Sequence, residues 1–309
     1  MAGNSKTAIY AALAGNTLIA ITKFIAASIT GSSAMLSEGI HSLVDTGNQG
    51  LLLYGMKSAK KPPDERFPFG HGKEIYFWSF IVAILIFAVG AGVSIYEGIH
   101  HILHPEPIKS IIINYVVLGL AIIFEGFALA IALREFNKAK GNQSYVDAVK
   151  QGKDPTLFVV VFEDSAALLG LLVALIGITL ANITGILQFD GIASVIIGLI
   201  LAGTAFWLAA ETKSLLIGEA AHPEIIKAIH KIANSIPEIQ HVNEVLTMHF
   251  GPDFLLVNIS ANFKDSAKAD DVEEAVEDLE TRIKRQFPEV KRMFVEAEER
   301  RYIRHGKSA

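Results

Sequence analysis

Six long apolar runs constrain this chain more than any other feature of its sequence. Each is close to the roughly 20 residues with which an α-helix, rising about 1.5 Å per residue, crosses the hydrocarbon core of a bilayer. The runs cover residues 8–29, 34–56, 76–98, 111–133, 157–181 and 192–210. The 309-residue chain is 51% hydrophobic and 19% charged, a composition that fits contact with lipid. The sequence therefore predicts a polytopic α-helical membrane protein with six transmembrane helices.

Basic residues gather in alternate loops between these runs. The loop after the second run holds Lys57, Lys60, Lys61, Arg66 and Lys73, the loop after the fourth holds Arg134, Lys138, Lys140, Lys150 and Lys153, and the opposite loops hold only Lys109. Because Lys and Arg prefer the cytoplasmic side of a membrane, both termini are expected in the cytoplasm. No mitochondrial presequence is recognisable. We expect an integral protein of the cytoplasmic membrane of a prokaryote.

A change of composition near Thr212 marks a second domain. Beyond it the chain is rich in charge and has the pattern helix, strand, strand, helix, strand. The predicted elements cover residues 222–235, 241–250, 254–263, 269–287 and 290–296. This order is typical of a ferredoxin-like α+β sandwich that lacks its first strand. The predicted division is a six-span transmembrane domain over residues 1–211 and a cytoplasmic α+β domain over residues 212–309.

Polar side chains inside the second apolar run indicate a function. Four of them are spaced by three, four and three residues, so they share one stripe of a helix: Glu38, His41, Asp45 and Asn48. An acid at the centre of a membrane helix costs about 2.5–3.5 kcal/mol on insertion scales and is seldom kept without a task. His41 and Asp45 are one turn apart, which brings an imidazole and a carboxylate within reach of one cation. A histidine that is simply satisfied in the core is the alternative, and the stripe favours the metal site.

The fifth run contains two adjacent acids, Glu163 and Asp164. Their charges repel each other at membrane depth, and a bound dication or a shared proton would relieve the repulsion. Neighbouring residues differ by about 100° around a helix, so one acid faces a cavity directly and the other approaches from its edge. Glu125 in the fourth run is either a proton-relay residue or a structural partner of Lys23, and the sequence leaves both interpretations open.

The stretches SSAMLSEGIHSLVDTGNQ and RFPFGHGKEIYFWS resemble the cation diffusion facilitators, and FEDSAALLG is most similar to the zinc-transporter-nine-like branch. The resemblance extends over nearly the whole chain. It implies a homodimer whose cytoplasmic domains pair, and a secondary active transporter that exports a divalent metal ion from the cytoplasm in exchange for protons. Zinc is the ion that the resemblance implies. Manganese, iron and cobalt remain alternatives, because ligand type alone does not choose among them.

The resemblance also assigns metal ligands in the transmembrane domain. The residues that match family ligands are His41, Asp45 and Asp164. The fifth-span HxxxD motif of the family begins at Val160 here, and valine cannot bind a metal. Since tetrahedral zinc takes four ligands, a replacement is needed. Glu163 is the first candidate, Asn48 the second and water the third.

Other family sites are incomplete in this sequence. The loop site is represented weakly by Asp64 and His71, while Phe67 stands where a further histidine is common. The strands of the cytoplasmic domain lack the His and Asp of the family's dimer site, so the resemblance carries no regulatory metal over to them. Three histidines of an outer loop either collect metal weakly or are ordinary polar residues: His100, His101 and His104.

The sequence also argues against several other classes of protein. It contains no cysteine, which excludes disulfides and thiolate metal sites. It has no GxxxxGK phosphate loop, so no nucleotide is expected, and no nucleic-acid partner is predicted. We find no set of nucleophile, base and orienting residue, so the chain is not expected to be an enzyme. A membrane metal sensor that binds the ion without transporting it is the alternative function.

Overall fold

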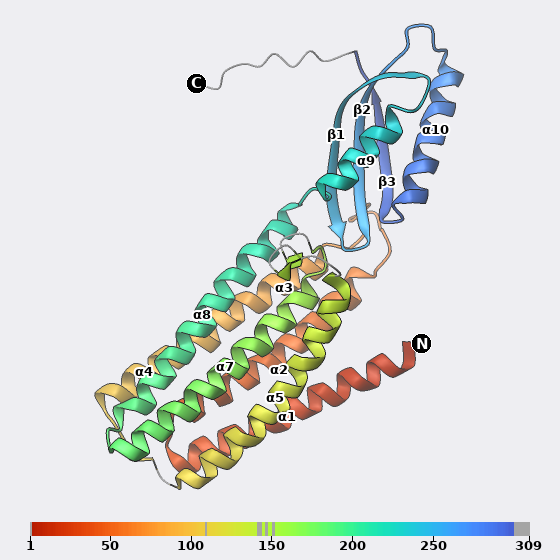
Figure 1. Ribbon diagram of the computed structural model, residues 1–309. Helices are drawn as coiled ribbons and strands as arrows, with labels where there is room; N and C mark the ends of the chain where they lie inside the picture. Colours follow the sequence, from red (N-terminus) through yellow and green to blue (C-terminus); the bar gives the residue numbers. More distant parts are fainter. Residues whose placement is uncertain (1, 109, 141–143, 146–147, 150–151, 300–309) are drawn as a thin grey trace, which may run out of the picture. The chain divides into compact units, whose positions relative to one another are not determined.

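The computed structural model describes residues 2–108, 110–140, 144–145, 148–149 and 152–299. Its elements in chain order are α1 (Ala2–Thr30), α2 (Ser33–Ala59), α3 (Glu74–Leu85), η1 (Ile86–Ala91), α4 (Gly92–Leu103), α5 (Ile111–Lys140), α7 (Pro155–Thr184), α8 (Gln188–Ile217), α9 (Pro223–Ala233), β1 (Ile239–Gly251), β2 (Phe254–Phe263), α10 (Ala269–Gln286) and β3 (Val290–Ala297). The chain divides into two compact units, one of residues 1–58 with 74–213 and one of residues 59–73 with 214–309 (Figure 1).

The first unit is helical and contains four strongly apolar helices. Within the described residues, the helices long and apolar enough to cross a membrane are Glu74–Leu103, Ile111–Lys138, Phe158–Thr184 and Gln188–Ile217. They correspond to the third to sixth apolar runs of the sequence. The first of the four joins α3 to α4 through the π-helical segment η1. The chain is therefore a helical membrane-type protein, as predicted.

Within the described residues, the two N-terminal helices are not among those that meet this criterion. In α1 the described apolar stretch is Asn16–Thr30, which is shorter than a full span. In α2 the polar stripe lowers the hydropathy, because each ionisable side chain opposes insertion into lipid. That these two helices complete a set of six spans remains a prediction.

Glycines allow α4 and α8 to pack closely. A Cβ atom at Gly98 would lie 2.6 Å from the backbone nitrogen of Val195, and one at Gly191 would lie 2.8 Å from the carbonyl oxygen of Gly98. Both distances are too short for any other residue, so the two backbones touch directly, as is common where membrane helices meet. This contact places the C-terminal turns of α4 beside the first turn of α8.

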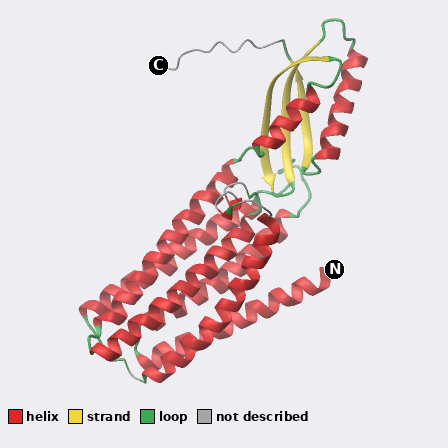
Figure 2. Cartoon of the chain, viewed as in Figure 1, coloured by secondary structure: helices red, strands yellow, loops and turns green. Residues whose placement is uncertain are grey.

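The second unit holds all the strands that the structure describes (Figure 2). Its sheet has the order β1-β2-β3, with β1 antiparallel and β3 parallel to the central strand β2. The parallel pair is joined through α10, as a β-α-β connection requires. The observed order α9, β1, β2, α10, β3 matches the helix, strand, strand, helix, strand pattern read from the sequence.

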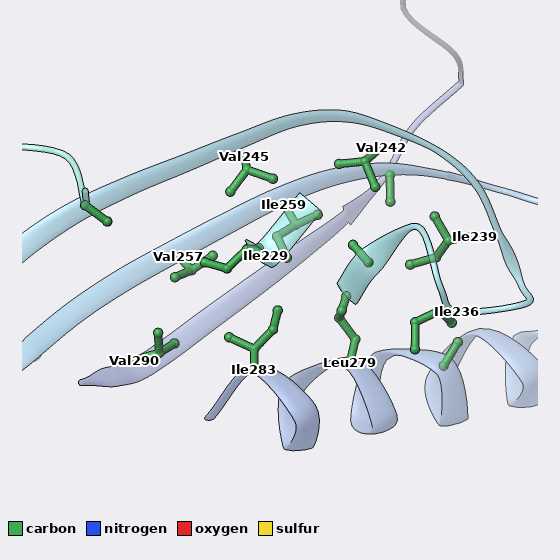
Figure 3. Close-up of a cluster of buried hydrophobic side chains, with 14 of the residues drawn as sticks. Ile229, Ile236, Ile239, Val242, Val245, Val257, Ile259, Leu279, Ile283 and Val290 are labelled. Carbon is green, nitrogen blue, oxygen red and sulfur yellow. The ribbon is translucent and has the colours of Figure 1, made fainter. Parts of the chain in front are cut away.

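The core of this unit forms between the sheet and its helices (Figure 3). Alternate residues of β2 point to one face, and residues of α10 four apart meet them, as the periods of a strand and a helix require. The fully buried positions include Leu255, Val257, Ile259, Ala261, Leu279 and Ile283. The loop before α3 belongs to the same unit. A Cβ atom at Gly72 would lie 2.2 Å from the carbonyl oxygen of Phe250, so only glycine lets the loop backbone pass the end of β1.

Candidate metal centre

The polar stripe of α2 faces the interior of the helical unit. Glu38 and Asn48 are fully buried, and His41 and Asp45 keep only 1% and 7% of their surface exposed. Leu43, Gly47 and Gly50 are exposed on another side of the helix, and the spacing of three, four and three places all four polar side chains inside the unit. Burial of four polar groups needs partners, and the partners divide the stripe into two parts.

The first part is an ion pair between α1 and α2. Lys23 Nζ lies 3.1 Å from Glu38 Oε2, and both side chains are completely buried. The same ammonium group donates a hydrogen bond to Ser42 Oγ at 2.7 Å. On the other side, a Cβ atom at Gly170 of α7 would lie 2.4 Å from Glu38 Oε1, so this glycine makes room for the carboxylate. Glu38 is thus neutralised by Lys23 and is a poor candidate ligand. The sequence contains a signal for this pair. Lys23 is the lone lysine of an apolar run, and a lysine in such a run needs an acid nearby.

The second part contains His41 and Asp45, whose ligand atoms lack partners. His41 Nδ1 and Asp45 Oδ1 are 3.3 Å apart. Neither this oxygen nor either ring nitrogen of His41 has a hydrogen-bond partner among the described residues, although all three atoms are buried. A buried polar atom without a partner costs about 1–3 kcal/mol, so native structures rarely retain one without a reason. A cation bound between these two side chains would satisfy both.

The helix α7 brings Glu163 to the same place. Asn48 Nδ2 donates a hydrogen bond to Glu163 Oε1 at 2.7 Å, and only 3% of Glu163 is exposed. The carboxyl groups of Glu163 and Asp45 interact with each other electrostatically. Two buried carboxylates repel each other unless a proton or a cation reduces their charge. This pair of acids could therefore take up either one.

Asp164 occupies a different position around α7. It is half-buried and interacts electrostatically with Glu163 and with Glu125 of α5. In the described part of the chain, no three His, Asp or Glu side chains lie close enough to hold one metal ion. His41, Asp45 and Asp164 therefore do not surround a single point in this structure, and the role of Asp164 as a ligand stays a prediction.

Glu125 adds a third helix to the group of acids. Its side chain is 7% exposed, and its charge acts on Asp45, Glu163 and Asp164. Lys23 makes its ion pair with Glu38, and its charge also acts on Glu125, so both interpretations of Glu125 stay predictions.

The loop residues Asp64 and His71 form a local pair. His71 Nε2 lies 2.9 Å from Asp64 Oδ2, while Asp64 Oδ1 accepts hydrogen bonds from the backbone N–H groups of Arg66 and Phe67. The ring of Phe67 packs against His71 with centroids 4.6 Å apart. These contacts lower the pKa of Asp64, first through His71 and then through the N–H of Phe67. The contacts of Asp64 and His71 stabilise a turn of the loop. A metal-binding role for the two residues stays a prediction.

Comparison with known proteins identifies the class of this chain. The cation efflux transmembrane domain family matches residues 9–217, and the chain belongs to this family of membrane transporters. Members of the family are transporters and not enzymes, which confirms that part of the prediction.

The relatives place the chain in the zinc-transporter-nine-like branch. It is 34% identical over 246 residues to the human protein named proton-coupled zinc antiporter SLC30A9, mitochondrial; the match spans 79% of this chain and 43% of the relative. Metal tolerance protein C4 of Arabidopsis thaliana is 30% identical over 251 residues, which is 81% of this chain and 55% of that protein. Manganese efflux system protein MneP of Bacillus subtilis is 22% identical over 293 residues, 92% of each chain. This chain thus spans less than half the length of the human relative.

The loop pair generates a prediction about pH. Because the pKa of Asp64 is lowered in the folded loop, its contribution to loop stability is present above the unfolded value and is lost as pH falls through the folded value. Substitution His71→Ala should raise the pKa of Asp64 toward that of a free aspartate, about 3.9. Carboxyl ¹³C NMR titration of the aspartate-labelled chain measures this, with His241→Ala as control. An unchanged Asp64 titration in His71→Ala would contradict the pairing.

Proposed function

We propose that this chain is a secondary active transporter that exports a divalent metal ion, zinc, from the cytoplasm in exchange for protons. The supporting observation is the set of buried ligand atoms without partners on His41 and Asp45, next to Glu163. Family membership supports efflux of a divalent cation. The name of the human relative, a proton-coupled zinc antiporter, supports zinc and proton exchange.

The proposed exchange follows from the protonation states that metal binding demands. Imidazole and carboxylate groups bind a metal ion only when they are deprotonated, so loading the ion releases protons. Without the ion, the repulsion between Asp45 and Glu163 favours a proton on one of them. Arrival of zinc from the cytoplasm expels this proton, and His41 supplies a neutral nitrogen. Protonation of the same acids from the other side weakens the shell and releases the ion.

The ligand set of the proposed site is His41, Asp45, Asp164 and Glu163, with Asn48 or water as the next candidate. Because Glu163 and Asp164 differ by about 100° around α7, a rotation of this helix would exchange one acid for the other at the ion. We propose that Glu163 holds the place that Val160 cannot fill. The hydrogen bond from Asn48 to Glu163 keeps this carboxylate oriented toward α2.

There are two alternatives. One concerns the identity of the ion, and the other concerns whether the ion is transported or only bound. A shell richer in oxygen than the usual one also admits manganese, iron or cobalt, and the name of the Bacillus relative includes manganese. A metal sensor would bind the ion at the same site without moving it. A metal-sensitive dye trapped in liposomes separates the sensor from the transporter, since only a transporter fills the interior.

The remaining architecture is proposed on the same grounds. Residues 1–211 form the transport domain with six spans, and residues 212–309 form a ferredoxin-like cytoplasmic domain that pairs with a second copy. The prokaryotic cytoplasmic membrane stays a prediction from the sequence. The names of the mouse and human relatives include the word mitochondrial.

Removal of Asp45 tests the transport site. Asp45→Ala should abolish zinc uptake into proteoliposomes, because it removes a ligand charge, while expression and dimerisation stay intact. The matched control is Asp265→Ala, an exposed aspartate of the second unit. Dye fluorescence inside the vesicles is the measurement. Uptake by Asp45→Ala at the natural rate would show that the ion takes another route.

Removal of the charge at residue 163 tests the replacement of the missing ligand. Glu163→Gln keeps the hydrogen bond from Asn48 possible, yet should weaken zinc binding by about 10–100-fold or shift the pH dependence of transport. Adding Val160→His to this variant should restore part of the activity by rebuilding the family motif. Zinc uptake measured at several pH values between about 6 and 8 gives the result. Normal transport by Glu163→Gln over that range would leave Asn48 or water as the fourth ligand.

Cysteine labelling tests the orientation. The chain contains no cysteine, so single substitutions report one position each. A cysteine at exposed Lys60 should react with an impermeant reagent only from the cytoplasmic side, and one at exposed Pro107 only from the opposite side. The reverse pattern would overturn the proposed topology.

A further inference from the structure

A second group of possible ligands lies in a cavity at the other end of α2. The cavity has a volume of about 300 Å³ and is lined by the end of α1, the start of α2 and the end of α4. Its ionisable lining residues are Glu97, His100, His101, His104 and Glu106. Leu36 of α2 also lines it, nine residues before Asp45, which is roughly 13 Å along the helix axis. The cavity is therefore separate from the transport site.

Three of these residues share one face of α4, and a fourth follows its end. Glu97, His100 and His101 have the spacing i, i+3, i+4 within the helix, and His104 is its C-cap residue. The rings of His100 and His104 are stacked with centroids 5.1 Å apart and an interplanar angle of 15°. Two histidines one helical turn apart are the arrangement that helical zinc motifs use. Both side chains are exposed, so their rotamers can adjust to an ion.

His101 is the buried histidine of this group. It is 7% exposed, and its buried Nε2 atom has no hydrogen-bond partner among the described residues. The nearest acid is Asp190 of α8, whose Oδ2 lies 3.6 Å from this nitrogen. Asp190 is fully buried and is fixed by Ser32 Oγ at 2.7 Å and by the backbone N–H of Ser33 at 2.6 Å. This separation is too long for a hydrogen bond, so Asp190 acts on the imidazole by its charge and Nε2 stays unsatisfied.

We infer that this cavity is a second divalent-cation site, with His100 and His104 as its first ligands and zinc as the class of ion it prefers. Glu97 and Glu106 supply carboxylates for the remaining positions, and His101 stands behind them on its Asp190 support. Imidazole nitrogens select zinc over calcium or magnesium, which prefer oxygen ligands. Among the described residues, no three of these side chains converge on one point. Binding therefore requires the exposed side chains of His100 and His104 to turn toward the ion.

The position suggests a use, and this step rests on the proposed function. The site lies on the loops opposite to the basic ones, which is the side where the transporter would release its ion. An ion leaving Asp45 would meet neutral imidazoles there. The site would then hold zinc briefly at the exit, and acidification would release it by protonating the histidines.

Calorimetric titration of the purified full chain with zinc tests the inference. In the Asp45→Ala background, which lacks the transport site, zinc binding should persist. Adding His100→Ala and His104→Ala should then weaken it by about ten-fold or more, because two direct ligands are lost. His230→Ala, a histidine of the second unit, is the matched control and should change nothing.

The outcomes separate this inference from the proposed function. If the Asp45→Ala chain binds no zinc, or if the double histidine variant binds it as tightly as its parent, the second site is overturned and those histidines are ordinary polar surface. If both variants behave as expected, the site exists, whatever the transport assay shows. Zinc transport by the natural chain alone tests the proposed function, and its failure would leave the binding result unchanged.

Discussion

A charge inside an apolar helical unit needs an opposite charge, a proton or a hydrogen-bond donor, and this constraint organises the protein. Lys23 and Glu38 meet it permanently, with their charged atoms 3.1 Å apart and no exposed surface. Breaking such a pair would leave one charge alone, at a cost of about 3–5 kcal/mol. The pair therefore locks α1 to α2 and keeps Glu38 out of the metal chemistry. Gly170 lets α7 pack against the same carboxylate.

The rest of the stripe meets the constraint only in part, and that is where function is possible. The carboxyl groups of Asp45 and Glu163 act on each other electrostatically, and Asn48 holds Glu163 in place through a hydrogen bond. His41 has no hydrogen-bond partner within the described residues. A proton and a metal ion are interchangeable solutions to this deficit, since either one reduces the repulsion between the acids. Exchange of the two across a membrane is what antiport consists of.

Much of this could be predicted from the sequence, because hydropathy and helical spacing are local properties. The apolar runs gave four of the helices, and the spacing of residues 38, 41, 45 and 48 placed the polar stripe on one face. The contacts between helices could not be predicted in the same way. Spacing does not tell whether Lys23 pairs with Glu38 or Glu125, or that Glu163, and not Asp164, is the acid bonded to Asn48. Those choices depend on how the helices are rotated, which glycines such as Gly170 help to set.

The second cavity shows the same limit. Three histidines in a loop are unremarkable in a sequence, and His101 gains meaning only when α8 places Asp190 behind it. The first turn of α2 is held by the same carboxylate through Ser32 and Ser33. Both candidate sites thus lie beside α2 at different depths, although the ligands of the second come from α4 and the residues after it.

The most direct test of the central claim is a cryo-electron microscopy map of the zinc-loaded chain. We expect density for an ion about 2.0–2.2 Å from the ligand atoms of His41 and Asp45, with a carboxylate of α7 as a further ligand. The carboxylate would be that of Glu163, Asp164 or both. A map in which these side chains keep their present contacts, while zinc occupies no position between α2 and α7, would contradict the account.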